Sequence, residues 1–467
     1  MLDPSLQPMI ENHPFNDIKV GDTAHLTRTL HADDIQLFAA MSGDVNPARV
    51  DQEYARSTQF HGLIAHGMWG GAMISTVIGT EFPGPGTIYL GQSLRFMRPV
   101  HVGDTLQIRV TVLTKDDSNH QITLDCRCTD QHGVDVITGT ARVIAPREKI
   151  RRVRTAPLQV RLWDAESRMR QLLALTAGLP PTTVAVVHPC NADALQGALA
   201  AAALGLITPI LVGPEQKIRS IASTAGIELR GTRIVDAAHS HAAAAQSVAM
   251  ARNGTVQALM KGSLHTDELM AEVVHLTTGL RTDRQISHVY VLDVPAYPKS
   301  LLISDAAINI EPDLEAKRDI VRNAIDLAHA IGITLPKVAI LAAVETVNPK
   351  MRSTVDAAAL CKMAQRGQIT GAIVDGPLAF DNAISAQAAH DKGIDSAVAG
   401  QADILIAPDL EAANMIGKQL QYLADAQSAG LVMGARVPII LTSRADGANA
   451  RVASCALAVL TVKAKAL

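Results

Sequence analysis

Aromatic residues are scarce in this chain, at 3% of 467 residues, whereas Ala, Leu, Ile and Val abound. This composition favours helices packed on parallel sheets over an all-β or carbohydrate-binding surface. The charges are nearly balanced, with 42 Lys and Arg against 45 Asp and Glu, so no broad basic field attracts nucleic acid or anionic lipid. We therefore expect a mainly α/β protein that binds small molecules and other subunits, with no nucleic acid and no membrane.

Cysteine is also scarce, with five scattered residues and no pair at metal-ligand spacing beside histidines, so we expect no metal site. Cys126 and Cys128 alternate along a predicted strand as small core or surface residues. The N-terminus lacks the basic start and apolar run of a signal peptide, and no later run reaches membrane-spanning length. These absences predict a protein of the reducing cytoplasm.

The length predicts about three compact units. The clearest seam is the basic, proline-bounded stretch Pro146–Pro157, which we interpret as a solvated linker over residues 147–157. It divides an N-terminal domain, residues 1–146, from a C-terminal domain, residues 158–467.

Upstream of the seam, the pattern predicts a helix at Asp33–Ser42 and a second helix starting near Gly67. Four segments with partial period-two alternation follow and predict strands. A buried helix wrapped by an antiparallel sheet accounts for this order. The four segments are Thr87–Phe96, Thr105–Thr114, His120–Thr129 and Val134–Ile144.

Downstream, short apolar runs alternate with Ala-rich helical stretches, a rhythm that predicts parallel β/α units. Several runs end in Gly, Asp, Asn or Ser just before a helix. Such junctions would place the backbone N–H groups of the helix starts at one edge of the sheet, where anions bind. The runs are Val184–Val187, Ile207–Val212, Val338–Leu341, Ile369–Val374, Ile404–Ile406 and Pro438–Leu441, and the junctions are His188–Asp193, Lys261–Asp267, Asp375–Leu378, Pro408–Glu411 and Thr442–Asp446. No GxGxxG or Walker sequence is present, which weighs against a nucleotide site.

Three blocks of the N-terminal domain, Ser42–Pro47, Gly62–Met68 and Ile88–Ser93, resemble the MaoC-like (R)-specific enoyl-CoA hydratases. The resemblance implies a hot-dog α+β fold. A thioester carbonyl aimed at the helix that opens near Gly67 would have its developing negative charge stabilised by backbone N–H groups.

Hydration also needs a base, which in this family the resemblance assigns to Asp44 and to a histidine five residues later. That position holds Arg49, whose guanidinium has no lone pair with which to accept a proton, and which could pair with Asp44 and lower its basicity. His66 is left as a partial substitute or as a structural residue at a helix start. The domain is thus either a residual hydratase or a binding and assembly module.

Six blocks of the C-terminal domain together resemble the phosphate acetyltransferase and butyryltransferase family, with the butyryltransferase branch closer. The implied fold has two α/β subdomains, about residues 158–297 plus 436–467 and about 298–435, as in isocitrate and isopropylmalate dehydrogenases. The implied reaction converts short-chain acyl-CoA and phosphate into acyl phosphate and CoA, with no permanently bound cofactor. The blocks are Met260–Gly262, Gly279–Thr282, Ser304–Ile310, Val344–Lys350, Asp375–Ala379 and Ser443–Asp446.

From this resemblance, Arg444 would hold phosphate through its forked donors, and Ser443 would donate a hydrogen bond to the leaving thiolate or the carbonyl. Asp446 would be the proton-accepting base, although it is equally typical of a helix N-cap. The acetyltransferases carry their catalytic aspartate further along the next helix, where this chain has Ala450 and its neighbours.

The same resemblance makes five further residues candidates for binding CoA or phosphate or for lining the cleft: Lys261, Thr266, Arg281, Asn309 and Lys350. Helix capping is the alternative for Thr266 and a surface charge for Arg281. Both implied domain families pair with themselves, which predicts a homodimer or higher oligomer. The competing hypotheses are a non-catalytic CoA-thioester-binding protein and an oxidoreductase of the isocitrate dehydrogenase type.

Overall fold

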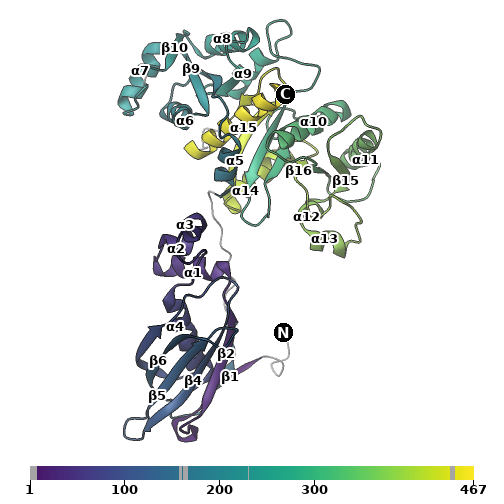
Figure 1. Cartoon of the computed structure of the whole chain (residues 1–467). Coiled ribbons are helices and arrows are strands. Elements are labelled where there is room, and N and C mark those ends of the chain that lie inside the picture. The colour runs from purple at the N-terminus through teal and green to yellow at the C-terminus, as the bar shows by residue number, and fades with distance from the viewer. Residues whose placement is uncertain (1–7, 157–159, 161–166, 230, 442–446, 467) are drawn as a thin grey trace. The chain divides into compact units, whose positions relative to one another are not determined.

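In a computed structural model, the chain divides into two compact units, Met1–Trp163 and Asp164–Leu467. The structure describes residues 8–156, 160, 167–229, 231–441 and 447–466. Each unit has a hydrophobic core of its own. Figure 1 shows the helices and strands of the two units. The units are therefore described separately.

The N-terminal unit is built on a five-stranded sheet in which every neighbouring pair is antiparallel. Alternate residues of its strands are buried, as period two requires. Cys126 and Cys128 both lie in this core as free thiols, which confirms the prediction that they are small core residues. In spatial order the strands are β2 (Thr23–Thr29), β4 (Thr105–Asp116), β5 (Gln121–Thr129), β6 (Asp135–Ile144) and β3 (Ile88–Phe96).

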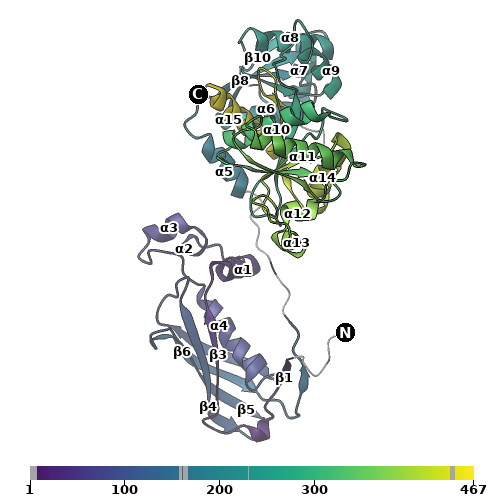
Figure 2. The same ribbon diagram turned by 90° about the vertical axis from the view of Figure 1, so that its right-hand side faces the viewer.

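Helix α4 (Gly67–Thr76) packs against one face of this sheet (Figure 2). Gly70 permits the close approach, because a Cβ there would lie 2.3 Å from Ile137 Cδ1. The buried helix and the antiparallel sheet confirm the predicted hot-dog arrangement, and of the five strands in this sheet β2 is the one that was not predicted. The remaining elements are a 3-10 turn, η2 (Phe15–Asp17), helices α1 (Ala32–Ser42), α2 (Pro47–Val50) and α3 (Gln52–Ser57), and a π-helical turn, η3 (Val77–Glu81), after α4.

A second, two-stranded sheet joins the two ends of the N-terminal unit. Strand β1 (Met9–Glu11) pairs antiparallel with β7 (Arg151–Val153). Asn12 adds side-chain hydrogen bonds to the main chain of Pro85, Glu148 and Ile150. The solvated linker predicted over residues 147–157 is therefore wrong in its first part, because main-chain pairing holds residues 151–153 to the N-terminal unit.

The C-terminal unit contains one 11-stranded sheet with helices on both faces. From one edge to the other, the strands are β10 (Arg233–Asp236), β9 (Ile207–Gly213), β8 (Thr182–Val187), β11 (Ala258–Lys261), β18 (Ile439–Ile440), β17 (Gln427–Met433), β12 (Ser287–Asp293), β13 (Leu301–Ser304), β16 (Ile404–Ile406), β14 (Lys337–Leu341) and β15 (Ile373–Leu378).

Two sets of helices cover this sheet. One face carries α5 (Ser167–Leu175), α6 (Ala192–Ala203), α7 (Glu215–Thr224), α10 (Leu314–Ala330), α11 (Arg352–Gln365) and α15 (Ala448–Ala466). The other carries α8 (Ser240–Arg252), α9 (Thr266–Val273), α12 (Phe380–Ile384), α13 (Ala386–Asp391) and α14 (Leu410–Leu423).

The sheet consists of two parallel groups that run in opposite directions. Strands β10, β9, β8, β11 and β18 are parallel to one another, and so are β13, β16, β14 and β15. Between them, β17 is antiparallel to β18 and β12, and β12 is antiparallel to β13.

This reversal corrects the expectation that all the strand–helix junctions gather at one edge. Strands β8, β11 and β18 end at one edge of the sheet, whereas β16 ends at the opposite edge and Asp375–Leu378 lies within β15. The two-subdomain division and the likeness to dehydrogenase architecture stay predictions.

No helix in the described part of the chain is both long and apolar enough to cross a membrane. Within the same residues, His, Cys, Asp and Glu form no group of three that could hold a metal ion.

Candidate functional site

The N-terminal unit has a cavity of about 280 Å³ at the start of α4. His66 and Gly67 line it together with Arg49, Arg98 and the buried Trp69. Helix α4 has neither an acidic residue in its first turn nor a side-chain cap, so its first N–H groups lack a side-chain acceptor. The helix therefore presents the partial positive charge that the sequence predicted beside Gly67.

Arg49 lies where the family's histidine was expected, and it is held from two sides. Its Nε is 3.6 Å from Asp44 Oδ2, and its Nη1 donates to the Ala65 carbonyl at 2.5 Å. His66 is 2% exposed, and its Nε2 lies 2.9 Å from the Asp44 carbonyl oxygen and 3.8 Å from Asp44 Oδ2. The structure thus brings Asp44, His66 and Gly67 together, with a guanidinium among them.

In the C-terminal unit, a cavity of about 430 Å³ contains two of the predicted residues, Lys261 and Thr266. Lys261 ends β11 and is 5% exposed, and Thr266 is the first residue of α9. Leu441 also lines this cavity and directly precedes the Thr442–Asp446 segment. Two parallel strands therefore bring Lys261 and Leu441 to the same cavity, since Met260 pairs with Ile440.

A close main-chain contact fixes the turn after Lys261. The N–H groups of Gly262 and Ser263 donate to the carbonyls of Val187 and His188, both at 2.9 Å. A Cβ at Gly262 would lie 2.3 Å from the Val187 oxygen, so only glycine fits here. Lys261 therefore directly precedes a turn that main-chain hydrogen bonds hold against the end of β8.

The opposite wall comes from β12 and from the loop after β13. His288 and Tyr290 of β12 and Ala307 of the loop line the cavity. Burial lowers the pKa of His288 to about 4, so the ring is neutral at ordinary pH. Burial also raises the pKa of Asp305, although its carboxylate accepts N–H groups of His288, Ala307, Ile308 and Asn309.

Three other predicted residues do not line this cavity. Asn309 donates its side-chain amide to the Ile286 carbonyl and to Asp305, and accepts from Gln285. Arg281 and Lys350 are exposed. Ser443, Arg444 and Asp446 lie outside the described residues.

Sequence reasoning missed several cavity residues: His265, His288, Tyr290, Asn414 and Lys418. Lys418 comes from α14, and its Nζ donates to Gln421 at 3.1 Å. Asn414, one turn earlier, donates to the Ala306 carbonyl at 3.1 Å. Their spacing of four along a helix was the available signal, but every amphipathic surface helix shows such spacing.

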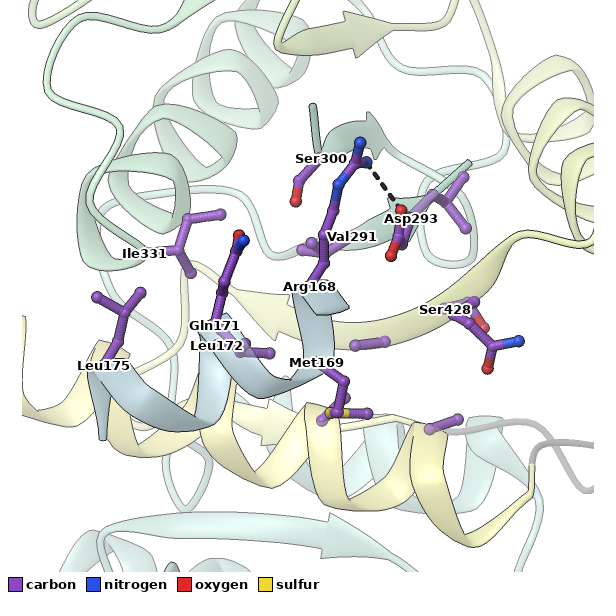
Figure 3. A pocket seen from close by; sticks show the side chains of 15 residues that line it. Arg168, Met169, Gln171, Leu172, Leu175, Val291, Asp293, Ser300, Ile331 and Ser428 are labelled. Carbon is purple, nitrogen blue, oxygen red and sulfur yellow. Dashed lines mark ion pairs between the residues drawn. The ribbon is translucent and has the colours of Figure 1, made fainter. Parts of the chain in front are cut away.

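A smaller cavity of about 140 Å³ lies on the α5 and α15 face of the C-terminal unit (Figure 3). Arg168 points across it to Asp293, with Nη1 2.8 Å from Oδ1, and also donates to the Tyr297 carbonyl at 2.7 Å. Leu172, Leu175 and Ile331 make its wall apolar. The ion pair anchors α5 to β12, and none of the predicted site residues lines this cavity.

Two family models match the chain, one in each unit. Residues 241–459 match the model described as phosphate acetyl/butaryl transferase. Residues 17–130 match the model described as MaoC like domain.

Relatives of the C-terminal unit include a phosphate acetyltransferase of Rhizobium meliloti, 60% identical over 299 residues that cover 64% of this chain and 95% of the relative. A phosphate butyryltransferase of Clostridium beijerinckii is 41% identical, and the match covers 62% of this chain and 96% of that relative. These two values contradict the expectation that the butyryltransferase branch is closer.

Among solved structures, a branched-chain phosphotransacylase from Enterococcus faecalis V583 is 29% identical, with a TM-score of 0.53. The match covers 60% of this chain and 99% of that one.

Proposed function

Since this chain belongs to the phosphate acetyl/butyryltransferase family, we propose that its C-terminal unit exchanges phosphate for coenzyme A on a short acyl group in the cavity beside Lys261. One observation carries this assignment. A buried lysine, a second lysine at Lys418 and the residue preceding the Thr442–Asp446 segment all border one cavity of about 430 Å³. That volume lies within the range typical of small-molecule sites.

The cavity suits a reaction between anions. Phosphate carries a double negative charge, and charge also develops on the thioester oxygen and the departing sulfur. The ammonium groups of Lys261 and Lys418 reduce the cost of holding these charges together.

In the forward direction, a phosphate oxygen attacks the thioester carbonyl carbon. The new C–O bond forms, the C–S bond breaks, and the proton of hydrogen phosphate ends on the CoA thiol. Arg444 holds the phosphate through its paired donors, Ser443 donates a hydrogen bond to the sulfur or the carbonyl, and Asp446 carries the proton. These three roles follow from the family motif at Ser443–Asp446.

The test is release of free thiol from acetyl-, propionyl- and butyryl-CoA, each with phosphate. Phosphate-dependent release that Arg444→Ala abolishes is the expected result, and the rates rank the acyl groups. Arg366→Ala, at an exposed position after α11, is the matched control and should leave the rate unchanged. Absence of release with all three thioesters would contradict the proposal.

For the N-terminal unit we propose binding of a CoA thioester without hydration. The observation that favours this role is the pairing of Arg49 with Asp44 and with the Ala65 carbonyl, which leaves a protonated group where a base is needed. The uncapped start of α4 still offers N–H groups to a thioester carbonyl.

We also propose a homodimer formed through the N-terminal unit. Strand β3 is at the edge of its sheet, and Ile88, Leu90 and Phe96 on it are large, exposed apolar residues. An unpaired edge with such side chains is suited to pairing with a second copy. Light scattering during gel filtration should give twice the chain mass, and a monomer at micromolar concentration would refute the dimer.

A further inference from the structure

The ring of Tyr290 lies between the sheet and helix α14. Tyr290 is on β12 and is 9% exposed, in a hydrophobic cluster that also contains Ala413 of α14. A Cβ at Gly417 of α14 would lie 3.1 Å from the ring atoms Cδ2 and Cε2. The missing side chain at Gly417 is therefore what lets the ring lie so close to the helix.

A second contact holds the ring from its own strand. His288, two residues earlier on β12, points to the same face of the sheet. The centroids of the two rings are 4.6 Å apart, and the interplanar angle is 86°. Edge-to-face rings at this separation attract each other. Contacts with His288 and with α14 at Gly417 together fix where the ring of Tyr290 lies.

The same ring forms part of the wall of the cavity beside Lys261. Lys261 and Lys418 give this wall its positive charge, which suits phosphate. The acyl chain is the part of the substrates that carries no charge, so it is most stable against the apolar side chains. These apolar side chains are Leu264, Tyr290, Ala307 and Leu441.

Hydrogen bonds also fix the loop that meets α14 beside the ring. Asn414 of α14 donates its side-chain amide to the Ala306 carbonyl at 3.1 Å, and the Ala307 N–H donates to Asp305 Oδ1 at 3.1 Å. Asn414 and Gly417 are three residues apart and so lie on one face of the helix. The wall around the ring therefore cannot widen for a longer ligand without loss of packing and of these bonds.

We propose that Tyr290 sets the upper length of the acyl group: its ring closes the apolar side of the cavity beside Lys261, so that short acyl groups fit and longer ones do not. The inference rests on the transferase function proposed above, and it names the feature of the substrate that the site selects. An acyl chain that reaches the ring can grow only by displacing it from His288 and α14. One methylene group more or less in a filled pocket changes the rate by about 10- to 200-fold.

The test measures kcat/KM of thiol release for acetyl-, butyryl- and hexanoyl-CoA, each with phosphate, and compares their ratios within one protein sample. The folded fraction scales all of these rates equally, so the ratios do not depend on it. Tyr290→Val removes the ring and keeps a residue that suits a strand. We expect this variant to raise the ratio of hexanoyl- to acetyl-CoA at least about 10-fold over the wild type.

Two matched substitutions separate the ring from general loosening of the core. Tyr290→Phe keeps the ring and should keep the wild-type ratio. Tyr297 is another buried tyrosine of the same hydrophobic cluster, at 8% exposed, but it does not line the cavity. Tyr297→Val deletes the same atoms as Tyr290→Val and should also leave the ratio at its wild-type value.

Gly417→Ala acts on the ring from the helix. The new methyl group would lie 3.1 Å from two ring atoms, which is closer than ordinary van der Waals contact, so the ring must move off α14. We expect this shift to narrow the cavity and to lower the ratio of butyryl- to acetyl-CoA. In the Tyr290→Val background the same substitution should not lower that ratio, because the ring on which it acts is gone.

The outcomes distinguish this inference from the transferase function itself. An unchanged hexanoyl-to-acetyl ratio in Tyr290→Val, or an equal rise in Tyr290→Phe or Tyr297→Val, would overturn the role of Tyr290. So would a wild-type chain that uses hexanoyl-CoA as readily as acetyl-CoA. If Tyr290→Val does not fold, Gly417→Ala decides, and an unchanged butyryl-to-acetyl ratio is then the contrary result. Absence of thiol release from every thioester in the wild type would instead refute the transferase assignment.

Discussion

The Arg49→His substitution should give the N-terminal unit a hydration activity that the wild-type chain lacks. Imidazole has a lone pair that accepts a proton from water, whereas guanidinium stays protonated. The rest of the site is present, because Asp44 and His66 already lie beside the start of α4. The change thus supplies the missing base and removes the cation that pairs with Asp44.

The size of the gain follows from the geometry. General base catalysis contributes roughly 100- to 10,000-fold, and we expect the low end, about 100-fold or ~2.7 kcal/mol of barrier. Asp44 is 46% exposed, and His66 Nε2 is engaged by the Asp44 carbonyl, so neither can fully orient a new imidazole. Loss of the Arg49 bond to Ala65 should also cost about 2 kcal/mol of stability.

The assay follows the loss of ultraviolet absorbance when a short trans-enoyl-CoA is hydrated. Arg56→His, on the exposed side of α3, is the matched control and should give no gain. Adding Asp44→Ala to Arg49→His should abolish the new activity. If the wild-type chain hydrates as fast as Arg49→His, the argument that a guanidinium blocks the base is wrong.

Three further outcomes can be checked on the purified protein. Burial lowers the pKa of His288 to about 4 in the folded chain, whereas in the unfolded chain it stays near 6.5. The unfolded chain therefore binds a proton below pH 6.5 that the folded chain does not bind until about pH 4. The free energy of unfolding should consequently fall by about 3 kcal/mol as the pH drops from 6.5 to 4. Urea unfolding at about pH 7 and about pH 5 should show a smaller loss in His288→Gln. Lys317→Met removes the ammonium group whose Nζ lies 2.7 Å from the buried Asp356 Oδ2, and it should lower the free energy of unfolding in urea by about 3 kcal/mol. An unchanged free energy would mean that Arg352 alone compensates the charge of Asp356. Burial raises the pKa of the Cys126 and Cys128 thiols to about 12, so mass spectrometry should find them unalkylated at about pH 8 until denaturant is added, and rapid labelling of the folded chain would contradict their burial.

Much of the N-terminal fold could be predicted from the sequence, because the physics there is local. Period-two alternation placed β3, β4, β5 and β6 within two residues of their observed bounds, and the glycine-rich segment after His66 opens α4 as expected. β2 was missed because only Ala24 and Leu26 on it are apolar, so its alternation is too short to stand out in the sequence.

The direction of the strands in the C-terminal unit could not be predicted in the same way. An apolar run shows that a strand is buried but not which way it points, so the antiparallel β12 and β17 were not foreseen. Several residues of the cavity beside Lys261 were missed for the same reason. His288 and Lys418 come together only through the register of β12 and the packing of α14, and neither carries a motif.

The pairing of β1 with β7 also bears on how such a chain could have arisen. It puts the entry and the exit of the N-terminal unit side by side, closing the unit on itself before the chain continues. A module whose two ends meet can be gained, lost or exchanged during evolution without cutting through its own core. A gene fragment that stopped at residue 146 would strip β1 of its partner, so the natural border of this module falls after Val153.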